Sequence, residues 1–166
     1  QPDQPRDPLG AYGRSKSAGE QVVEEILGCG VESRATILRT GWVYGPVGRN
    51  FLLTMLRLHR LKAEAGEPLR VVADQVGCPT ATFGLAAACW AVIQHEVMGV
   101  LHWSDAGVAS WYDFAVAIGE LAVSHGVLSQ AAQVLPITTT DYPPPAKRPA
   151  YSLLACGNTR EQLHLV

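Results

Sequence analysis

The chain has 166 residues, 48% of them apolar and 17% charged, and its formal net charge is −2. These values are typical of a globular protein of one domain, or a large part of one, and they exclude a disordered chain. The small net charge predicts no general attraction to nucleic acid or to an anionic membrane, and no apolar run reaches the roughly 20 residues that a transmembrane helix needs.

Cysteines and histidines are scattered, and this sets the expectations for redox state and metals. The four cysteines, at positions 29, 78, 89 and 156, form no CxxC pair, and the five histidines are equally dispersed. We therefore expect no disulfide framework, no metal site and a reducing, cytoplasmic location.

The first elements along the chain are predicted to be a loop, a helix and a strand. Residues 1–10 hold three prolines and no hydrophobic period, which indicates a loop. Helical periodicity over 11–27 places Val22, Val23, Ile26 and Leu27 on an apolar face. Residues 34–44, which include the run 35–40, are predicted to form a buried strand that runs into a loop at 45–46.

The rest of the chain alternates helices and strands. Asn50 is placed to cap a helix over 50–63, and Thr80 or Thr82 to cap one that reaches about residue 96. Ser110 opens a helix to residue 124, with Leu121 among its inward residues. Short strands are predicted at 69–73, 100–103 and 134–138, a turn at 77–80, a stiff loop at 142–149 and a last helix at 158–163. This alternation predicts an α/β fold.

A glycine-rich turn of the GxGxxG or GxxGxxG kind is missing from the sequence. That turn brings a backbone close to the pyrophosphate of a dinucleotide. Because the first residues indicate a loop and the last ones directly follow a helical pattern, we expect the chain to be the C-terminal portion of a longer dinucleotide enzyme. We also expect the chain by itself to bind dinucleotide weakly and to lack activity.

Tyr12 and Lys16 are four residues apart on a predicted helix, so they share one face. A lysine ammonium beside a tyrosine favours the phenolate, which lets the pair act as acid and base on a carbonyl or alcohol oxygen. The four-residue pattern alone is weak, because it also arises when a solvated lysine follows a half-buried tyrosine. Its flanks, the small residues Ser15, Ala18 and Gly19, favour close helix packing.

The run from Tyr12 to Glu20 resembles the active-site helix of extended short-chain dehydrogenases, and it is most similar to the dTDP-4-dehydrorhamnose reductase family. Gly41 stands where the family usually has serine. Asp74-Gln75-Val76-Gly77-Cys78-Pro79-Thr80 resembles the reductase branch and differs from the epimerases and dehydratases. Further segments match in the family's order: 39–45, 50–58, 110–115 and 142–149.

The resemblance implies a Rossmann-like extended short-chain dehydrogenase whose N-terminal dinucleotide-binding half is absent from this chain. Residues 1–45 would supply the catalytic helix and the next strand, and residues 46–166 mainly the substrate-binding lobe with returning Rossmann elements. The implied activity of the parent enzyme is reduction of the C4 keto group of dTDP-4-dehydro-L-rhamnose by NADP(H) or NAD(H). Tyr12 would donate the proton, Lys16 would bind the nicotinamide ribose and support the tyrosine, and both Tyr12 and Lys16 would belong to the cofactor-binding site. A homodimer stays open, as does Mg²⁺, which nothing in the sequence supports.

Trp42, Gln75 and Arg148 are the expected substrate-binding residues. The family uses the tryptophan at position 42 against the deoxysugar; the alternative is a core tryptophan with a satisfied N–H. Gln75 either shapes its loop or contacts the nucleotide. Arg148, with Lys147, either grips a diphosphate or lies in a solvated basic loop. The remaining tryptophans are expected to pack internally: Trp90, Trp103 and Trp111.

Two further interpretations remain open. The scaffold also suits another sugar-nucleotide reductase or an epimerase. A related family member, the regulatory subunit of methionine adenosyltransferase, binds a partner and NADP without turning over sugar.

Arg39, in the predicted strand, needs a charge partner if it is buried, and we expect that partner to be structural.

Overall fold

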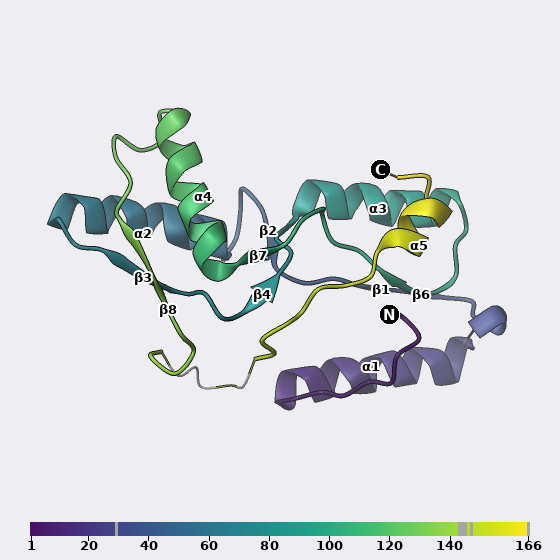
Figure 1. Cartoon of the computed structure of the whole chain (residues 1–166). Coiled ribbons are helices and arrows are strands. Elements are labelled where there is room, and N and C mark those ends of the chain that lie inside the picture. Colours follow the sequence, from purple (N-terminus) through teal and green to yellow (C-terminus); the bar gives the residue numbers. More distant parts are fainter. Residues whose placement is uncertain (29, 143–145, 147, 166) are drawn as a thin grey trace.

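The computed structural model in Figure 1 describes residues 1–28, 30–142, 146 and 148–165 and confirms the α/β class. Its elements in chain order are α1 (Ala11–Leu27), η1 (Gly30–Glu32), β1 (Thr36–Arg39), β2 (Val43–Tyr44), α2 (Phe51–Ala65), β3 (Leu69–Val72), β4 (Val76–Gly77), β5 (Thr80–Ala81), α3 (Thr82–Gln94), β6 (Gly99–His102), β7 (Ala109–Ser110), α4 (Trp111–Ser124), β8 (Val134–Ile137) and α5 (Gly157–Gln162).

One lobe is a sandwich of α1, the parallel pair β1–β6, and α3 (Figure 1). Strand residues alternate between its faces because successive side chains point to opposite sides. Leu38 packs against a core that includes Ala88 and Ala91 of α3. Arg39 and His102, which are paired in register, share a cleft with residues of α1.

The second lobe contains α2, α4 and the parallel pair β3–β8 (Figure 1). Its core is formed by six buried apolar residues: Met55, Leu69, Val71, Ala115, Ile118 and Ala132. The helices cross where His59 of α2, which is completely buried, meets Gly119 of α4. Short pairs, β2–β5 and β4–β7, lie between the two lobes.

Two of the predicted helix caps are present. Asn50 accepts a hydrogen bond from the backbone N–H of Leu53 at 3.1 Å. Ser110 and Asp113 form a capping box, in which the Ser110 Oγ accepts from the Asp113 N–H and the Asp113 carboxylate accepts from the Ser110 N–H. Both caps were predictable because capping is a local, three-residue interaction.

The third predicted cap is wrong. Ala81 occupies the N-cap position of α3, and no side chain caps it. Thr80 instead belongs to β5, where its buried hydroxyl donates to the Cys78 carbonyl at 3.2 Å. The ends of the predicted turn over 77–80 belong to β4 and β5, so only residues 78 and 79 lie between the two strands, which pair with β7 and β2.

Burial differs from expectation in the sandwich lobe and on α4. Trp90 and Leu121, expected inside, are 65% and 59% exposed, and Ala122 is buried in place of Leu121. The strand β1 is only half-buried along its length, and none of the 17 described residues of α1 is buried. A β-carbon at Gly19 would meet nothing within 4 Å, so the expected close packing is not made by the described residues.

Candidate functional site

Tyr12 and Lys16 lie together at the start of α1. The Lys16 Nζ is 5.6 Å from the centroid of the Tyr12 ring, so the ammonium lies over the ring face. The Tyr12 side chain is largely exposed, and the residue is 77% accessible. The helix thus presents both groups toward the same region, as an acid–base pair requires.

A cleft of about 350 Å³ extends from Lys16 along the α1 face of the sheet. Its polar lining includes Glu20 from α1, Arg39 from β1 and His102 from β6, and Leu153 and Leu154 supply apolar wall. A larger cavity, of about 400 Å³, lies beside it and contains neither Tyr12 nor Lys16. We place the candidate site at the smaller cleft because Lys16, one member of the predicted pair, lines it, although Tyr12 is not among its lining residues.

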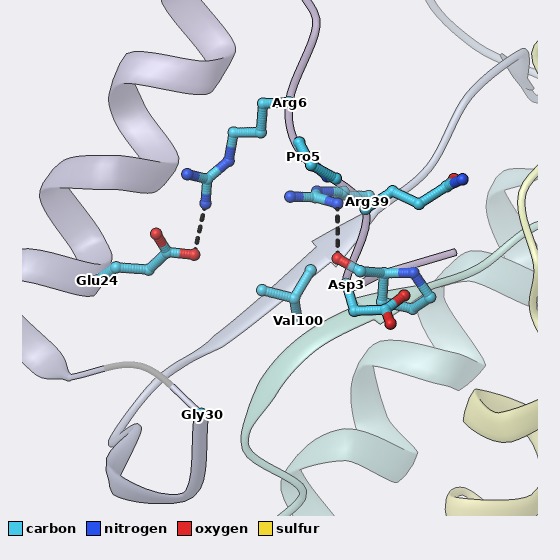
Figure 2. A pocket seen from close by; sticks show the side chains of 9 residues that line it. Asp3, Pro5, Arg6, Glu24, Gly30, Arg39 and Val100 are labelled. Carbon is cyan, nitrogen blue, oxygen red and sulfur yellow. Dashed lines mark hydrogen bonds and ion pairs between the residues drawn. The ribbon is translucent and has the colours of Figure 1, made fainter.

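A network of charges ties α1 to the strand beneath it. The Arg39 guanidinium donates to Glu20 from Nη2 at 2.7 Å and from Nε at 2.9 Å. Arg6 in turn donates to Glu20 from Nε at 2.7 Å and also bonds to Glu24 (Figure 2). The Arg39 Nη1 donates to the Pro2 carbonyl at 3.2 Å, which holds the first residues of the chain over the cavity. Arg39 therefore has the structural partner that we expected.

The electrostatics of the cleft follow from these contacts. Hydrogen bonds from Arg39, and then from Arg6, hold the pKa of Glu20 below its ordinary value despite partial burial. Burial, and secondly the nearby Arg39 charge, lowers the pKa of His102. Because the Arg39 Nη1, 3.4 Å away, can only donate, the His102 Nε2 must accept and the proton resides on Nδ1. The His102 Nδ1 has no hydrogen-bond partner in the part of the chain that the structure describes.

Trp42 lies away from this charge network, in the loop after β1. Its indole is stacked face to face on Trp111, with centroids 3.5 Å apart and planes 2° from parallel. Its Nε1 donates to the Ser152 Oγ at 3.2 Å. The satisfied N–H of Trp42 agrees with the packing interpretation. Its side chain is only half-buried, which is compatible with sugar binding.

Gln75 is 6% exposed and bonds to protein at both ends of its amide. The Trp111 Nε1 donates to its Oε1 at 3.3 Å, and its Nε2 donates to the Thr139 Oγ1 at 3.0 Å. This geometry favours the loop-shaping role for Gln75. Arg148 is exposed. Lys147 and the prolines at 143–145 lie outside the described residues.

Sequence patterns did not identify Glu20, His102, Trp111 or Ser152 as parts of the candidate site. Glu20 lies one helical turn beyond Lys16, and that spacing was an available signal. The other three lie 63 to 110 positions away from the residues that they contact: His102 contacts Arg39, and Trp111 and Ser152 contact Trp42. No local sequence signal marks these three residues.

The described part of the chain shows neither a cluster of metal ligands nor a helix that could span a membrane. Within residues 1–28, 30–142, 146 and 148–165, no group of three or more His, Cys, Asp or Glu side chains is placed to hold a metal ion. No described helix has the length and apolar character needed to span a bilayer.

Comparison with known proteins gives one consistent result. The family model for the RmlD substrate binding domain matches residues 1–166. A dTDP-4-dehydrorhamnose reductase from Aggregatibacter actinomycetemcomitans is 40% identical over 153 residues, covering 89% of this chain and 49% of that protein. This chain spans about half the length of the curated relatives that it matches.

Solved structures agree with the sequence comparison. A dTDP-4-dehydrorhamnose reductase from Clostridium acetobutylicum is 37% identical with a TM-score of 0.83, covering 98% of this chain and 52% of that one. A dTDP-4-dehydrorhamnose reductase from Bacillus anthracis, solved in complex with NADP, is 34% identical with a TM-score of 0.75, covering 97% and 54%. The expected Rossmann-like extended short-chain dehydrogenase fold is confirmed by these likenesses.

Proposed function

The chain belongs to the RmlD substrate binding domain family, and from that membership we propose that it forms the proton-transfer and sugar-binding part of a nicotinamide-dependent sugar-nucleotide reductase. The proposed reaction of the longer protein is reduction of the C4 keto group of dTDP-4-dehydro-L-rhamnose to give dTDP-L-rhamnose. The observation that carries the proposal is the Lys16 ammonium over the face of Tyr12, with Lys16 itself lining a cleft on the α1 face of the sheet.

The proposed roles follow from the chemistry of each side chain. Tyr12 protonates the alkoxide oxygen as the keto group is reduced, and its exposed position leaves room for a substrate to approach. Lys16 favours the phenolate that results and donates to the ribose hydroxyls of the cofactor. When bound, NADP(H) or NAD(H) supplies the hydride.

Substrate binding is assigned to the lobe beyond β1. Trp42 contacts the deoxysugar, and Arg148 pairs with the diphosphate, where a guanidinium matches phosphate geometry. For Gln75 we propose the architectural role, because both ends of its amide are used within the protein. A cytoplasmic location and a homodimer complete the proposal; free thiols at Cys78, Cys89 and Cys156 suit a reducing compartment.

The deciding experiment uses the protein expressed from the complete reading frame that encodes this chain. We expect NADPH oxidation that depends on dTDP-4-dehydro-L-rhamnose, and a loss of about 10²- to 10⁴-fold in kcat/KM for Tyr12→Phe. Tyr112→Phe, which removes a phenol hydroxyl from α4, is the matched control and should retain activity. No turnover with this substrate would refute the proposal, and turnover of another keto sugar alone would reassign the substrate.

The 166-residue chain gives a second measurement. Because it contains no glycine-rich pyrophosphate turn, we expect weak NADPH binding and no reductase activity from it. Substrate-dependent NADPH oxidation by the purified chain would contradict this expectation. Co-purification of the longer protein with a methionine adenosyltransferase, together with absence of keto-sugar turnover, would instead indicate a regulatory subunit.

A further inference from the structure

Trp42 adopts two unfavourable geometries, one in its backbone and one in the stacking of its ring. Its φ angle of 54° lies in the left-handed region, which bulky side chains rarely adopt. Its ring is stacked directly over Trp111, whereas aromatic pairs prefer offset or edge-to-face arrangements. Such costs persist only where the surrounding structure imposes them, and they concentrate at ligand-binding sites.

The edge of the Trp42 indole is held by a segment 110 residues away. Its Nε1 donates to the Ser152 Oγ. That hydroxyl donates in turn to the Val76 carbonyl at 3.1 Å, so its lone pairs are directed toward the indole. Gly77 lies under the same edge, because an added β-carbon there would be 2.5 Å from the Trp42 Nε1 and 2.8 Å from the Ser152 Oγ.

The face of the indole is held by Trp111, which is itself fixed by Gln75. An indole N–H can only donate, so the Gln75 atom that meets it is the amide oxygen, and this sets the orientation of the amide. The amide nitrogen donates to Thr139, and the Thr139 hydroxyl donates to Asp74 at 2.7 Å. Each rotatable group in this series therefore has one defined hydrogen-bonding direction.

We propose that Trp111, Gln75 and Ser152 are positioning residues that hold the Trp42 indole in one orientation, as a rigid wall for the sugar ring of the substrate. This inference rests on the proposed function for the identity of the ligand. It assigns to Trp111 and Ser152 a role in specificity, and it gives Gln75 an effect that is transmitted through Trp111. A rigid wall binds a sugar without the entropic cost of ordering an aromatic side chain.

The orientation of the indole can be tested in the 166-residue chain labelled with 5-fluorotryptophan. Four ¹⁹F resonances are expected, one for each tryptophan. Ser152→Ala and Gly77→Ala should shift or broaden the Trp42 resonance, which is identified by its loss in Trp42→Phe. The resonance of Trp103, which is buried in the other core with Ala88 and Ala91, serves as an internal standard. The matched control is Gly41→Ala, since a β-carbon there meets nothing within 4 Å.

The consequence for the substrate is tested in the longer protein by steady-state kinetics. Loss of one oriented hydrogen bond in Ser152→Ala should lower kcat/KM for the keto sugar about tenfold, with KM carrying most of the change. Ser152→Thr, which keeps the hydroxyl, should restore most of it, and KM for NADPH should stay unchanged in both variants.

The outcomes separate the two proposals. An unmoved Trp42 resonance in both Ser152→Ala and Gly77→Ala would overturn the positioning inference whatever the activity of the protein. A moved resonance with unchanged KM for the sugar would overturn the role in substrate binding. Absence of any turnover by the unsubstituted longer protein would instead refute the proposed function, and with it the identity of the ligand, while the ¹⁹F result would still decide whether Ser152 positions the Trp42 indole.

Discussion

Glu20, Arg39 and His102 line one cleft on the α1 face of the sheet, and their charges and hydrogen bonds depend on one another. The Glu20 carboxylate compensates the half-buried Arg39 charge. Arg39, by donating to His102, fixes the tautomer of that histidine. The His102 imidazole is buried, and burial, followed by the neighbouring Arg39 charge, lowers its pKa and so disfavours its protonated form.

The His102 imidazole should make stability depend on pH. Its pKa in the folded state is below the ordinary value of 6.5, so below pH 6.5 the unfolded chain binds a proton that the folded chain does not. The free energy of unfolding should therefore fall as the pH drops from about 6.5 to the folded-state pKa, and then stop falling from this cause. Urea unfolding of His102→Gln between pH 8 and 5 should show a flatter profile.

The control for this titration is His125→Gln, which removes an exposed histidine at the end of α4. Its pH profile should stay steeper than that of His102→Gln. The contribution of Glu20, whose pKa is also lowered, belongs to a different window: it is complete above about pH 4.5 and is lost as the pH falls through its folded-state value. Equal slopes in His102→Gln and the unsubstituted chain would rule out the histidine as the cause.

Gly119 allows α4 to pack closely against His59 of α2. A β-carbon there would lie 2.6 Å from the His59 Cε1 and 3.1 Å from the Ala131 Cβ. Gly119→Ala should therefore lower the free energy of unfolding by about 1–3 kcal/mol through overpacking. Gly19→Ala, also within a helix but in open space, should be neutral or stabilising. Equal urea midpoints for the two variants would contradict this account.

At the scale of single elements, α1 is attached to the sheet mainly by charge. None of its described residues is buried, and Val22 and Ile26 are 50% and 66% exposed. Its contact with the rest of the chain depends on Glu20 and Glu24, which pair with Arg39 and Arg6. The placement of Tyr12 and Lys16 relative to the sheet therefore depends on ion pairs that are themselves only partly shielded from water.

Glu20→Gln should loosen α1 without unfolding the second lobe. The variant removes charge-assisted hydrogen bonds to two arginines and should cost about 1–3 kcal/mol. Hydrogen–deuterium exchange should rise across 11–27 while exchange in α2 and α4 stays unchanged. Glu25→Gln, an exposed change on the same helix, is the control. Faster exchange throughout the chain, or none in α1, would show that the ion pairs do not hold this element.

At the scale of the whole molecule, α3 has apolar residues on all of its faces and no charged residue. Its inner side packs on the sheet through Ala88 and Ala91. Its outer side exposes Phe83, Trp90 and Ile93, by 89%, 65% and 64%. A contiguous apolar surface of this kind marks an association site.

The chain should therefore self-associate through its exposed apolar surface. Multi-angle light scattering should show a mass that rises with protein concentration, and Trp90→Lys should lower that mass toward the monomer. Leu121→Lys changes an exposed apolar residue on α4 and is the matched control. A monomer at all concentrations would refute the prediction, and equal effects of the two lysines would show that the surface of α3 has no special part in it.

The sequence by itself determined what depends on neighbours a few residues apart. The helix that carries Tyr12 and Lys16 follows from its periodicity, and the caps at Asn50 and Ser110 follow from side chains that reach backbone groups three positions away. The α/β class follows from the same local patterns, because alternating helices and strands have few ways to bury their apolar faces.

Only the tertiary structure decided which residues support the candidate site. The Arg39–His102 contact, the Trp42–Trp111 stack and the hydrogen bond from Trp42 to Ser152 join positions 63 to 110 residues apart. The exposure of Trp90 and Leu121 depends on which faces the rest of the chain covers. Local periodicity predicts neither these long-range contacts nor the exposure of these two residues, because both depend on how whole elements pack against one another.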